Sequence, residues 1–200
     1  MWTIAREWQG ETVFILASGP SVLDLDLSLL TGRRVIAIKS SWLHWPAADI
    51  LFFADGRWWR DGNLRPQAFA GQVVTTAQEI GDPGIFKLKK IHPHALSTDP
   101  GSVALARTST TGGINIAALK GAAKIVLLGV DGKLGADGQR HSHGLKWPWP
   151  KGGQPQAFAD QLAEYRAIAP SAAAMGIEIV NANPDSAVNV WPRLRFEDCL

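Results

Sequence analysis

The sequence predicts an α/β fold: a single Rossmann-like domain with a mainly parallel sheet, helices on both faces, and a long lid loop rich in His, Trp and Pro. Residues 12–17 form an apolar, partly β-branched run without alternation, which is typical of a strand covered on both faces. This run stops abruptly in a Ser-Gly-Pro-Ser turn. Further along, residues 108–131 join a helical pattern to a second buried strand, which indicates the alternation of a parallel sheet.

Composition favours one compact domain. The chain has 200 residues and 46% apolar content, so we expect one core over about residues 12–186, with a lid at about 132–153 and an extension at 187–200. The net charge of +2 is scattered, which does not indicate binding of duplex nucleic acid. The single cysteine, Cys199, suits a reducing cytoplasm. No secretory signal is visible, and no apolar run approaches the ~20 residues that span a bilayer.

The nine tryptophans are an unusual count. Trp58, Trp59, Trp147 and Trp149 occur in polar surroundings that contain Gly or Pro, so ligand stacking and an oligomer interface both stay open. Together with an apolar tail, these residues favour a homo-oligomer over a monomer.

The first turn comprises Ser18, Gly19, Pro20 and Ser21. Gly19 permits backbone angles that are closed to other residues, Pro20 fixes φ, and Ser21 can cap the helical segment that follows. A strand, turn and helix in this order direct backbone N–H groups at a bound phosphate. The turn is neither a dinucleotide fingerprint nor a P-loop, and an ordinary tight turn is the alternative.

Two further strands end in polar residues. Residues 33–38 run into Lys39, Ser40 and Ser41, and residues 49–54 run into Asp55. Short strands at 73–76 and 85–88 would lie to one side. Because ligands bind outside the carboxyl ends of parallel strands, we expect these polar residues to converge there with the first turn.

Residues 89–107 predict a long connection without regular structure. His92 and His94 lie in it. No Cys or carboxylate cluster accompanies them at zinc spacing, so we interpret them as surface histidines and predict no metal site.

In the second block, Thr108, Ser109 and Thr110 precede a helix that points at the same edge of the sheet. Asn115, inside that helix, would bond either a ligand or a neighbouring loop. The following strand, residues 125–128, ends near Asp131.

The loop at 132–153 emerges at the carboxyl edge and is typical of an active-site lid. His141 and His143 would share one face of an extended segment, so one of them could be a general base and the other structural. The sequence leaves open which. A helix at about 156–175 and a last strand at 176–180 follow, and the strand ends in polar residues that include Asn181, Asn183 and Ser186.

These motifs, in this order, resemble the bacterial lipooligosaccharide sialyltransferases and the related domain-of-unknown-function-115 proteins, which include a 6-hydroxymethylpterin diphosphokinase. The likeness covers most of residues 12–186 and is closest to proteins of that type encoded by tailed phages and prophages. It implies a metal-independent transfer from a CMP-sugar-like donor in the host cytoplasm, with no cofactor.

The resemblance also implies roles for individual residues. The first turn, Asp131 and residues 183–186 would surround the nucleotide. Ser109, next to Thr108, would lie near the donor's phosphate or sugar carboxylate. His143, or else His141, would deprotonate the acceptor hydroxyl.

The chain departs from the sialyltransferase pattern at several positions. Residues 17–21 read Ala-Ser-Gly-Pro-Ser in place of Gly-Asn-Gly-Pro-Ser, Lys39 replaces an Asn, and Thr110 replaces a Gly. The paired tyrosines that grip the donor phosphate have no counterpart, since the only tyrosine is Tyr165 in a predicted helix. The positive charge would then come from Arg107, Lys39 or Lys146.

Two classes of function therefore remain. The first is a glycosyltransferase that uses a nucleotide-activated donor and a histidine base. The second is a non-catalytic phage protein that binds or sequesters a nucleotide or serves in virion assembly. A diphosphokinase is a third interpretation, but it would need ATP, Mg²⁺ and a carboxylate pair that the sequence does not place. The sequence does not identify the acceptor.

Overall fold

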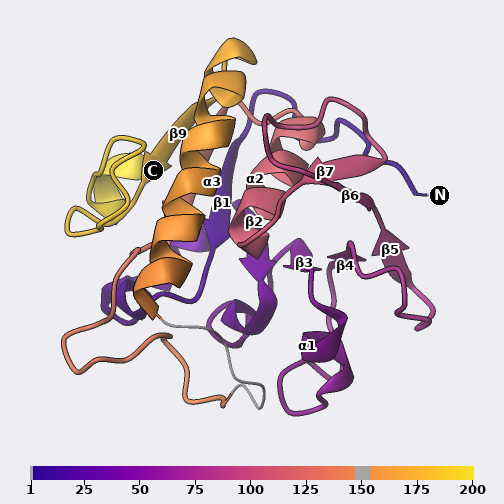
Figure 1. Cartoon of the computed structure of the whole chain (residues 1–200), viewed down its shortest axis with the longest axis horizontal. Coiled ribbons are helices and arrows are strands. Elements are labelled where there is room, and N and C mark those ends of the chain that lie inside the picture. Colours follow the sequence, from indigo (N-terminus) through magenta and orange to yellow (C-terminus); the bar gives the residue numbers. More distant parts are fainter. Residues whose placement is uncertain (1, 147–153) are drawn as a thin grey trace.

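The computed structural model describes residues 2–146 and 154–200, and it contains a seven-stranded parallel sheet (Figure 1). The strand order is β5-β4-β3-β2-β1-β8-β9. The strands are β1 (Thr12–Leu16), β2 (Arg34–Ile38), β3 (Ile50–Phe53), β4 (Gln72–Thr75), β5 (Ile85–Lys87), β8 (Lys124–Leu128) and β9 (Glu178–Asn181). Every pairing in this sheet is parallel, which confirms the predicted α/β, Rossmann-like fold.

The two longer helices cover one face of the sheet. These are α2 (Ser109–Lys120) and α3 (Gln154–Ala174). Ile114 of α2 and Ile168 of α3 are fully buried against strand residues such as Ile15. The absence of alternation in the central strands thus reflects burial from both sides.

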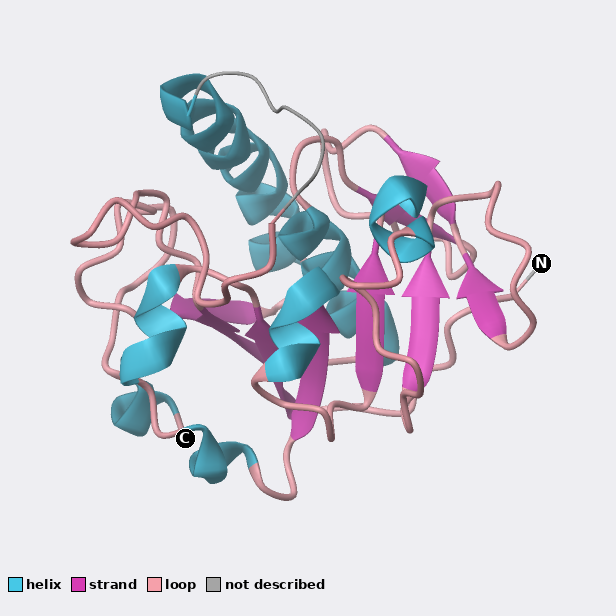
Figure 2. Cartoon of the chain, turned by 90° about the horizontal axis from the view of Figure 1, so that it is seen from below, coloured by secondary structure: helices cyan, strands magenta, loops and turns pink. Residues whose placement is uncertain are grey.

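Short helical turns and the C-terminal segment cover the other face (Figure 2). They include η1 (Pro20–Asp24), η2 (Leu27–Leu30), η3 (Lys39–Leu43), α1 (Gly56–Arg60) and η4 (Phe196–Cys199). Phe196 is buried and its ring meets the edge of Phe14 at a centroid distance of 6.1 Å. The C-terminal segment, which the sequence predicted as an extension at 187–200, therefore contributes to the core.

Two further expectations need correction. Residues 89–107 carry a separate two-stranded parallel sheet, formed by β6 (Lys89–Ile91) and β7 (Ser102–Ala104). Trp58 and Trp59 are core residues, 1% and 7% exposed, and they pack on Phe53.

None of the described helices is both long and apolar enough to cross a bilayer.

Candidate functional site

A cleft of about 180 Å³ lies at the carboxyl ends of β1, β2 and β8. The N-terminus of α2 and the side of α3 complete it. The loop that begins at residue 132 (orange, lower left) and α1 lie along this edge in Figure 1. The polar and charged residues of its lining are Ser18, Lys39, Arg107, Thr108, Ser109, Thr110, Asp131, Lys133, Arg140, His141, Gln161 and Tyr165.

The first turn is held against the end of β8. The backbone N–H of Gly19 donates to the carbonyl of Gly129 (2.9 Å). A Cβ atom on Gly19 would lie 2.4 Å from that carbonyl oxygen and 2.5 Å from Oδ2 of Asp131. Only glycine permits this close approach, so position 19 fixes how near the turn comes to Asp131.

The Asp131 carboxylate ties three segments together. It accepts hydrogen bonds from the backbone N–H of Ser21 (2.9 Å), the Ser21 hydroxyl (2.5 Å) and the side-chain amide of Asn183 (2.9 Å). Asn181 and Ser186 both donate to the carbonyl of Val130. Ser21, Asn181, Asn183 and Ser186 therefore build the wall behind the cleft, and none of the four lines it.

Lys39 follows β2 in an unusual backbone conformation. Its φ is +51°, the single positive value found for a residue other than glycine in the described part of the chain. The turn is fixed by Ser41, whose hydroxyl donates to the carbonyl of Leu16 (2.5 Å) and accepts from Ile38 N–H (2.8 Å). Ser40 accepts from the indole of Trp58 (3.0 Å), so it supports the turn, whereas Lys39 lines the cleft.

The start of α2 is anchored by two residues of α3. Glu164 is buried and accepts from the backbone N–H groups of Ala106 (3.0 Å) and Arg107 (2.5 Å). Burial raises the pKa of Tyr165, although its hydroxyl contacts Thr108 and Thr110. These contacts orient the residues that precede Ser109 toward the cleft.

A wider hollow of about 610 Å³ adjoins the cleft on the side of β3. It shares Lys39, Arg107, Thr108, Ser109 and Gln161 with the cleft. Asp55 lies here and accepts hydrogen bonds from the Arg57 guanidinium (2.8 and 3.0 Å). Burial acts to raise the pKa of Asp55, but the Arg57 hydrogen bonds and the charges of Lys39 and Arg57 outweigh it and lower that pKa.

The loop after β8 brings two histidines to the first turn. The backbone N–H of Ser142 donates to the carbonyl of Ser18 (2.9 Å), and the Ser18 hydroxyl lies 3.2 Å from Nδ1 of His141. The rings of His141 and His143 stack at 5.1 Å with an interplanar angle of 8°. His141 lines the cleft and His143 lies outside its lining.

His143 has a third histidine as a neighbour. Burial lowers the pKa of His143, and the charge of His44 lowers it further. Burial likewise lowers the pKa of His44. Nδ1 of His143 and Nε2 of His44 are buried without a hydrogen-bond partner in the described part of the chain. Sequence reasoning did not select His44, because nothing in its local pattern separates it from a surface histidine.

Other candidates lie elsewhere. Pro20 and Ser21 line a neighbouring hollow, which shares Asp131 and Lys133 with the cleft. Lys146 is exposed and absent from the linings of the cleft and the wider hollow. Trp147 and Trp149 lie outside the described residues. Asn115 bonds the backbone of Ser97 and Ala104, so it fixes a neighbouring loop.

Sequence reasoning also missed lining residues. Lys133 and Arg140 belong to the long loop, and Gln161 belongs to α3. Within residues 2–146 and 154–200, no three His, Cys, Asp or Glu side chains gather in a way that could hold a metal ion.

No protein-family model and no curated protein matches this sequence. Solved structures do match the fold. The MAf glycosyltransferase from Magnetospirillum magneticum AMB-1 superposes with a TM-score of 0.64 at 14% identity, over 100% of this chain and 36% of that one. This chain thus spans about a third of that protein's length. The sialyltransferase CstII from Campylobacter jejuni, solved with cytidine-5'-monophosphate as a substrate analogue, superposes with a TM-score of 0.56 at 11% identity, over 93% of this chain and 85% of that one. The fold of this chain is therefore similar to that of glycosyltransferases, a sialyltransferase among them.

Proposed function

We propose that this chain transfers a sugar from a nucleotide-activated donor to an acceptor hydroxyl. One observation carries the proposal: basic side chains outnumber acidic ones in the lining of the cleft at the carboxyl edge. Among the described residues, Lys39, Arg107, Lys133 and Arg140 line it together with one carboxylate, that of Asp131. Asp160 and Asp185, outside that lining, pair with Arg107 (3.6 Å) and Lys133 (2.5 Å), so a smaller positive excess remains. Such a surface favours an anionic ligand, and the N–H groups at the start of α2 add to the positive potential.

The dimensions suggest how the donor would lie. A cleft of about 180 Å³ is small for a nucleotide sugar, but the adjoining hollow adds about 610 Å³. We place the nucleotide in the cleft beside the first turn and Asp131, which are in direct contact with each other. The sugar would lie near Ser109, which lines both the cleft and the hollow. The acceptor would enter through the hollow with its hydroxyl directed toward His141 in the cleft. A cytidine nucleotide is our first choice, because CstII was solved with one.

The chemistry would proceed without a metal ion. A histidine removes the proton from the acceptor hydroxyl, whose oxygen then bonds to the donor's anomeric carbon. The bond from that carbon to the phosphate oxygen breaks, and the negative charge moves onto the departing nucleotide. Lys39 and Arg107 lie where they can stabilise that charge.

His141 and His143 both remain candidates for the base. We favour His141, because it lines the cleft and Ser18 can hold its Nδ1–H, in which case Nε2 would be the nitrogen that accepts the proton. His143 would then be the structural partner beneath it. The family resemblance suggests the opposite, with His143 as the base and His141 as the structural partner.

We further propose the setting that the resemblance implies, a phage or prophage protein that acts in the host cytoplasm. The alternative function is nucleotide sequestration without turnover, and the environment of Tyr165 favours it. Its hydroxyl is buried against Thr108 and Thr110, so the tyrosine grip on the donor phosphate is lacking.

Calorimetric titration with CMP, UMP, GMP and AMP tests the proposal first, and CMP-sugar turnover tests it second. We expect binding of at least one nucleotide, turnover of its sugar conjugate, and loss of turnover in His141→Ala with nucleotide affinity retained. Binding without turnover under any acceptor would select sequestration. Failure to bind any of the four nucleotides would refute both.

A further inference from the structure

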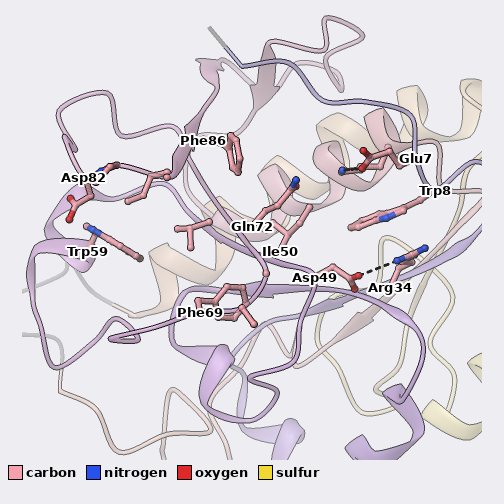
Figure 3. Close-up of a pocket in the computed structure, with 17 residues that line it drawn as sticks. Glu7, Trp8, Arg34, Asp49, Ile50, Trp59, Phe69, Gln72, Asp82 and Phe86 are labelled. Carbon is pink, nitrogen blue, oxygen red and sulfur yellow. Dashed lines mark hydrogen bonds and ion pairs between the residues drawn. The ribbon is translucent and has the colours of Figure 1, made fainter.

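A separate groove of about 760 Å³ lies at the opposite edge of the sheet, where β2, β3, β4 and β5 begin (Figure 3). It is elongated. Trp59 and Asp82 lie at one end, Trp8 and Arg34 lie at the other, and Gln72 lies between them. Its lining shares no residue with the cleft or the adjoining hollow.

The charges in this groove are already compensated. Lys120 is buried, its ammonium lies 2.5 Å from the Glu7 carboxylate, and it sits 5.0 Å from the centre of the Trp8 ring. The Arg34 guanidinium bridges the carboxylates of Glu11 (3.0 Å) and Asp49 (3.3 Å). Because each cation has a carboxylate partner, the groove lacks the surplus positive charge that a phosphate needs.

At the other end of the groove, the negative charge of Asp82 is compensated in the same way. Its carboxylate lies 3.5 Å from the Arg65 guanidinium. Arg34 serves two carboxylates at once, so the balance of the whole groove is slightly negative. The balance of charge here is thus opposite to that of the cationic cleft at the carboxyl edge.

Two buried polar atoms in the groove have no hydrogen-bond partner in the described part of the chain. One is the indole N–H of Trp59, a residue that is 7% exposed, and the other is Oε1 of Gln72. The first needs an acceptor and the second needs a donor. An ammonium or guanidinium group has no acceptor to offer Trp59, whereas a hydroxyl group can both donate and accept.

The rest of the lining is apolar. Phe69 and Phe86 are half-buried on either side of Gln72, with Ile50 and Val73 near them. Aromatic and aliphatic side chains with a few polar atoms are typical of small-molecule sites, and flat apolar surfaces suit the C–H faces of pyranose rings.

We propose that this groove binds a neutral oligosaccharide, whose hydroxyl groups bond Trp59 Nε1 and Gln72 Oε1 while its ring faces pack on Phe69 and Phe86. The groove has a volume of about 760 Å³ and its lining includes both Trp59 and Trp8, so it has room for a chain of several sugars. This site is independent of the proposed transferase activity, since it requires neither a nucleotide nor a base.

The test follows the indole ¹⁵N–¹H resonance of Trp59 in the labelled full chain, assigned by its absence in Trp59→Phe. Maltotetraose, cellotetraose and N-acetylchitotetraose are titrated up to about 10 mM, a range that covers weak affinities. We expect at least one of them to shift this resonance in a saturable way. Loss of one hydrogen bond in Gln72→Met should weaken that binding about fivefold. The exposed Gln67→Met, outside the groove, should leave it unchanged.

The proposal is overturned if none of the three tetrasaccharides moves the Trp59 resonance, or if Gln72→Met binds them as well as the parent chain. It is equally overturned if tetralysine or CMP moves this resonance and the sugars do not. The outcome is separate from nucleotide titration of the carboxyl-edge cleft, which reports on different residues.

Discussion

The Ser18 hydroxyl lies 3.2 Å from Nδ1 of His141, and the Ser18 carbonyl accepts a hydrogen bond from the backbone of Ser142. The end of the first strand thus holds a loop that lies more than a hundred residues later in the chain. A hydrogen bond between this pair would hold Nδ1 of His141 at the first turn and so direct Nε2 away from it.

Ser18→Ala should therefore lower turnover more than it lowers nucleotide affinity. At metal sites, loss of the partner that orients a ligating histidine costs about 10–100-fold in affinity or activity, and we expect a loss of about 10-fold here. Steady-state kinetics with a nucleotide sugar measure the loss, and Ser28→Ala, at an exposed serine bonded to Asp26, is the matched control. Equal effects of the two variants would contradict a role for Ser18 in orienting His141.

Gly19→Ala should destabilise the fold and abolish nucleotide binding. Its Cβ would lie 2.4 Å from the Gly129 carbonyl oxygen, so the turn must move. Overpacking of this kind costs about 1–3 kcal/mol in free energy of unfolding, measurable by urea denaturation. Gly62→Ala is the control, because a Cβ at Gly62 meets nothing within 4 Å. A fully stable Gly19→Ala variant would show that the turn is not tightly held.

Lys39→Gly should separate stability from binding. The φ of +51° is strained for lysine but not for glycine, so the free energy of unfolding should stay level or rise by up to about 1 kcal/mol. Nucleotide affinity should fall, because a cation is lost from the cleft.

Lys39→Ala is the companion variant. It loses the same charge and keeps the strain, so it should bind as weakly as Lys39→Gly and be less stable than that variant. Unaltered nucleotide affinity in both variants, measured by calorimetry, would remove Lys39 from the binding site.

His143 should make stability depend on pH in the acidic range. Burial and the charge of His44 lower its pKa below the ordinary value of 6.5, so the unfolded chain binds a proton more readily than the folded one. Its contribution to stability is present above pH 6.5 and is lost as the pH falls through the lower, folded-state pKa.

His143→Asn should therefore flatten the dependence of the urea midpoint on pH between about pH 5 and pH 7. His92→Asn, at an exposed position, should leave that dependence as it is. An unchanged slope in His143→Asn would mean that His143 titrates alike in both states.

The sequence predicts the sheet well because its central strands are buried on both faces, and such runs are unambiguous. The short strands β6 and β7 escaped prediction for the opposite reason. Each has three residues, and Lys89–Ile91 is exposed, so neither carries a periodic pattern. Their pairing is set by tertiary contacts, such as those of Asn115 with Ser97 and Ala104.

About half of the residues of the candidate site could be predicted from one rule, which is that the carboxyl ends of parallel strands lie at the same edge of the sheet. That rule brings Gly19, Lys39, Ser109 and Asp131 together in the cleft lining. The rule does not predict which polar side chains form hydrogen bonds within the turns and so do not face the cleft. Such side chains are those of Ser21, Ser40 and Asn183. Nor can the rule find Arg140 or Gln161, whose positions depend on how a long loop and a helix cross that edge.

The three hydrogen bonds to the Asp131 carboxylate make one side of the cleft more rigid than the other. The side built from the first turn and residue 183 cannot widen without breaking several bonds at once. Arg140 and His141 also line the cleft, and they belong to the loop after β8, which is joined to the first turn through Ser18. If His141 is the general base and the nucleoside lies beside it, a nucleobase too large for the cleft would displace the histidine. A purine nucleotide would then bind without reacting, because the general base would be out of line with the acceptor.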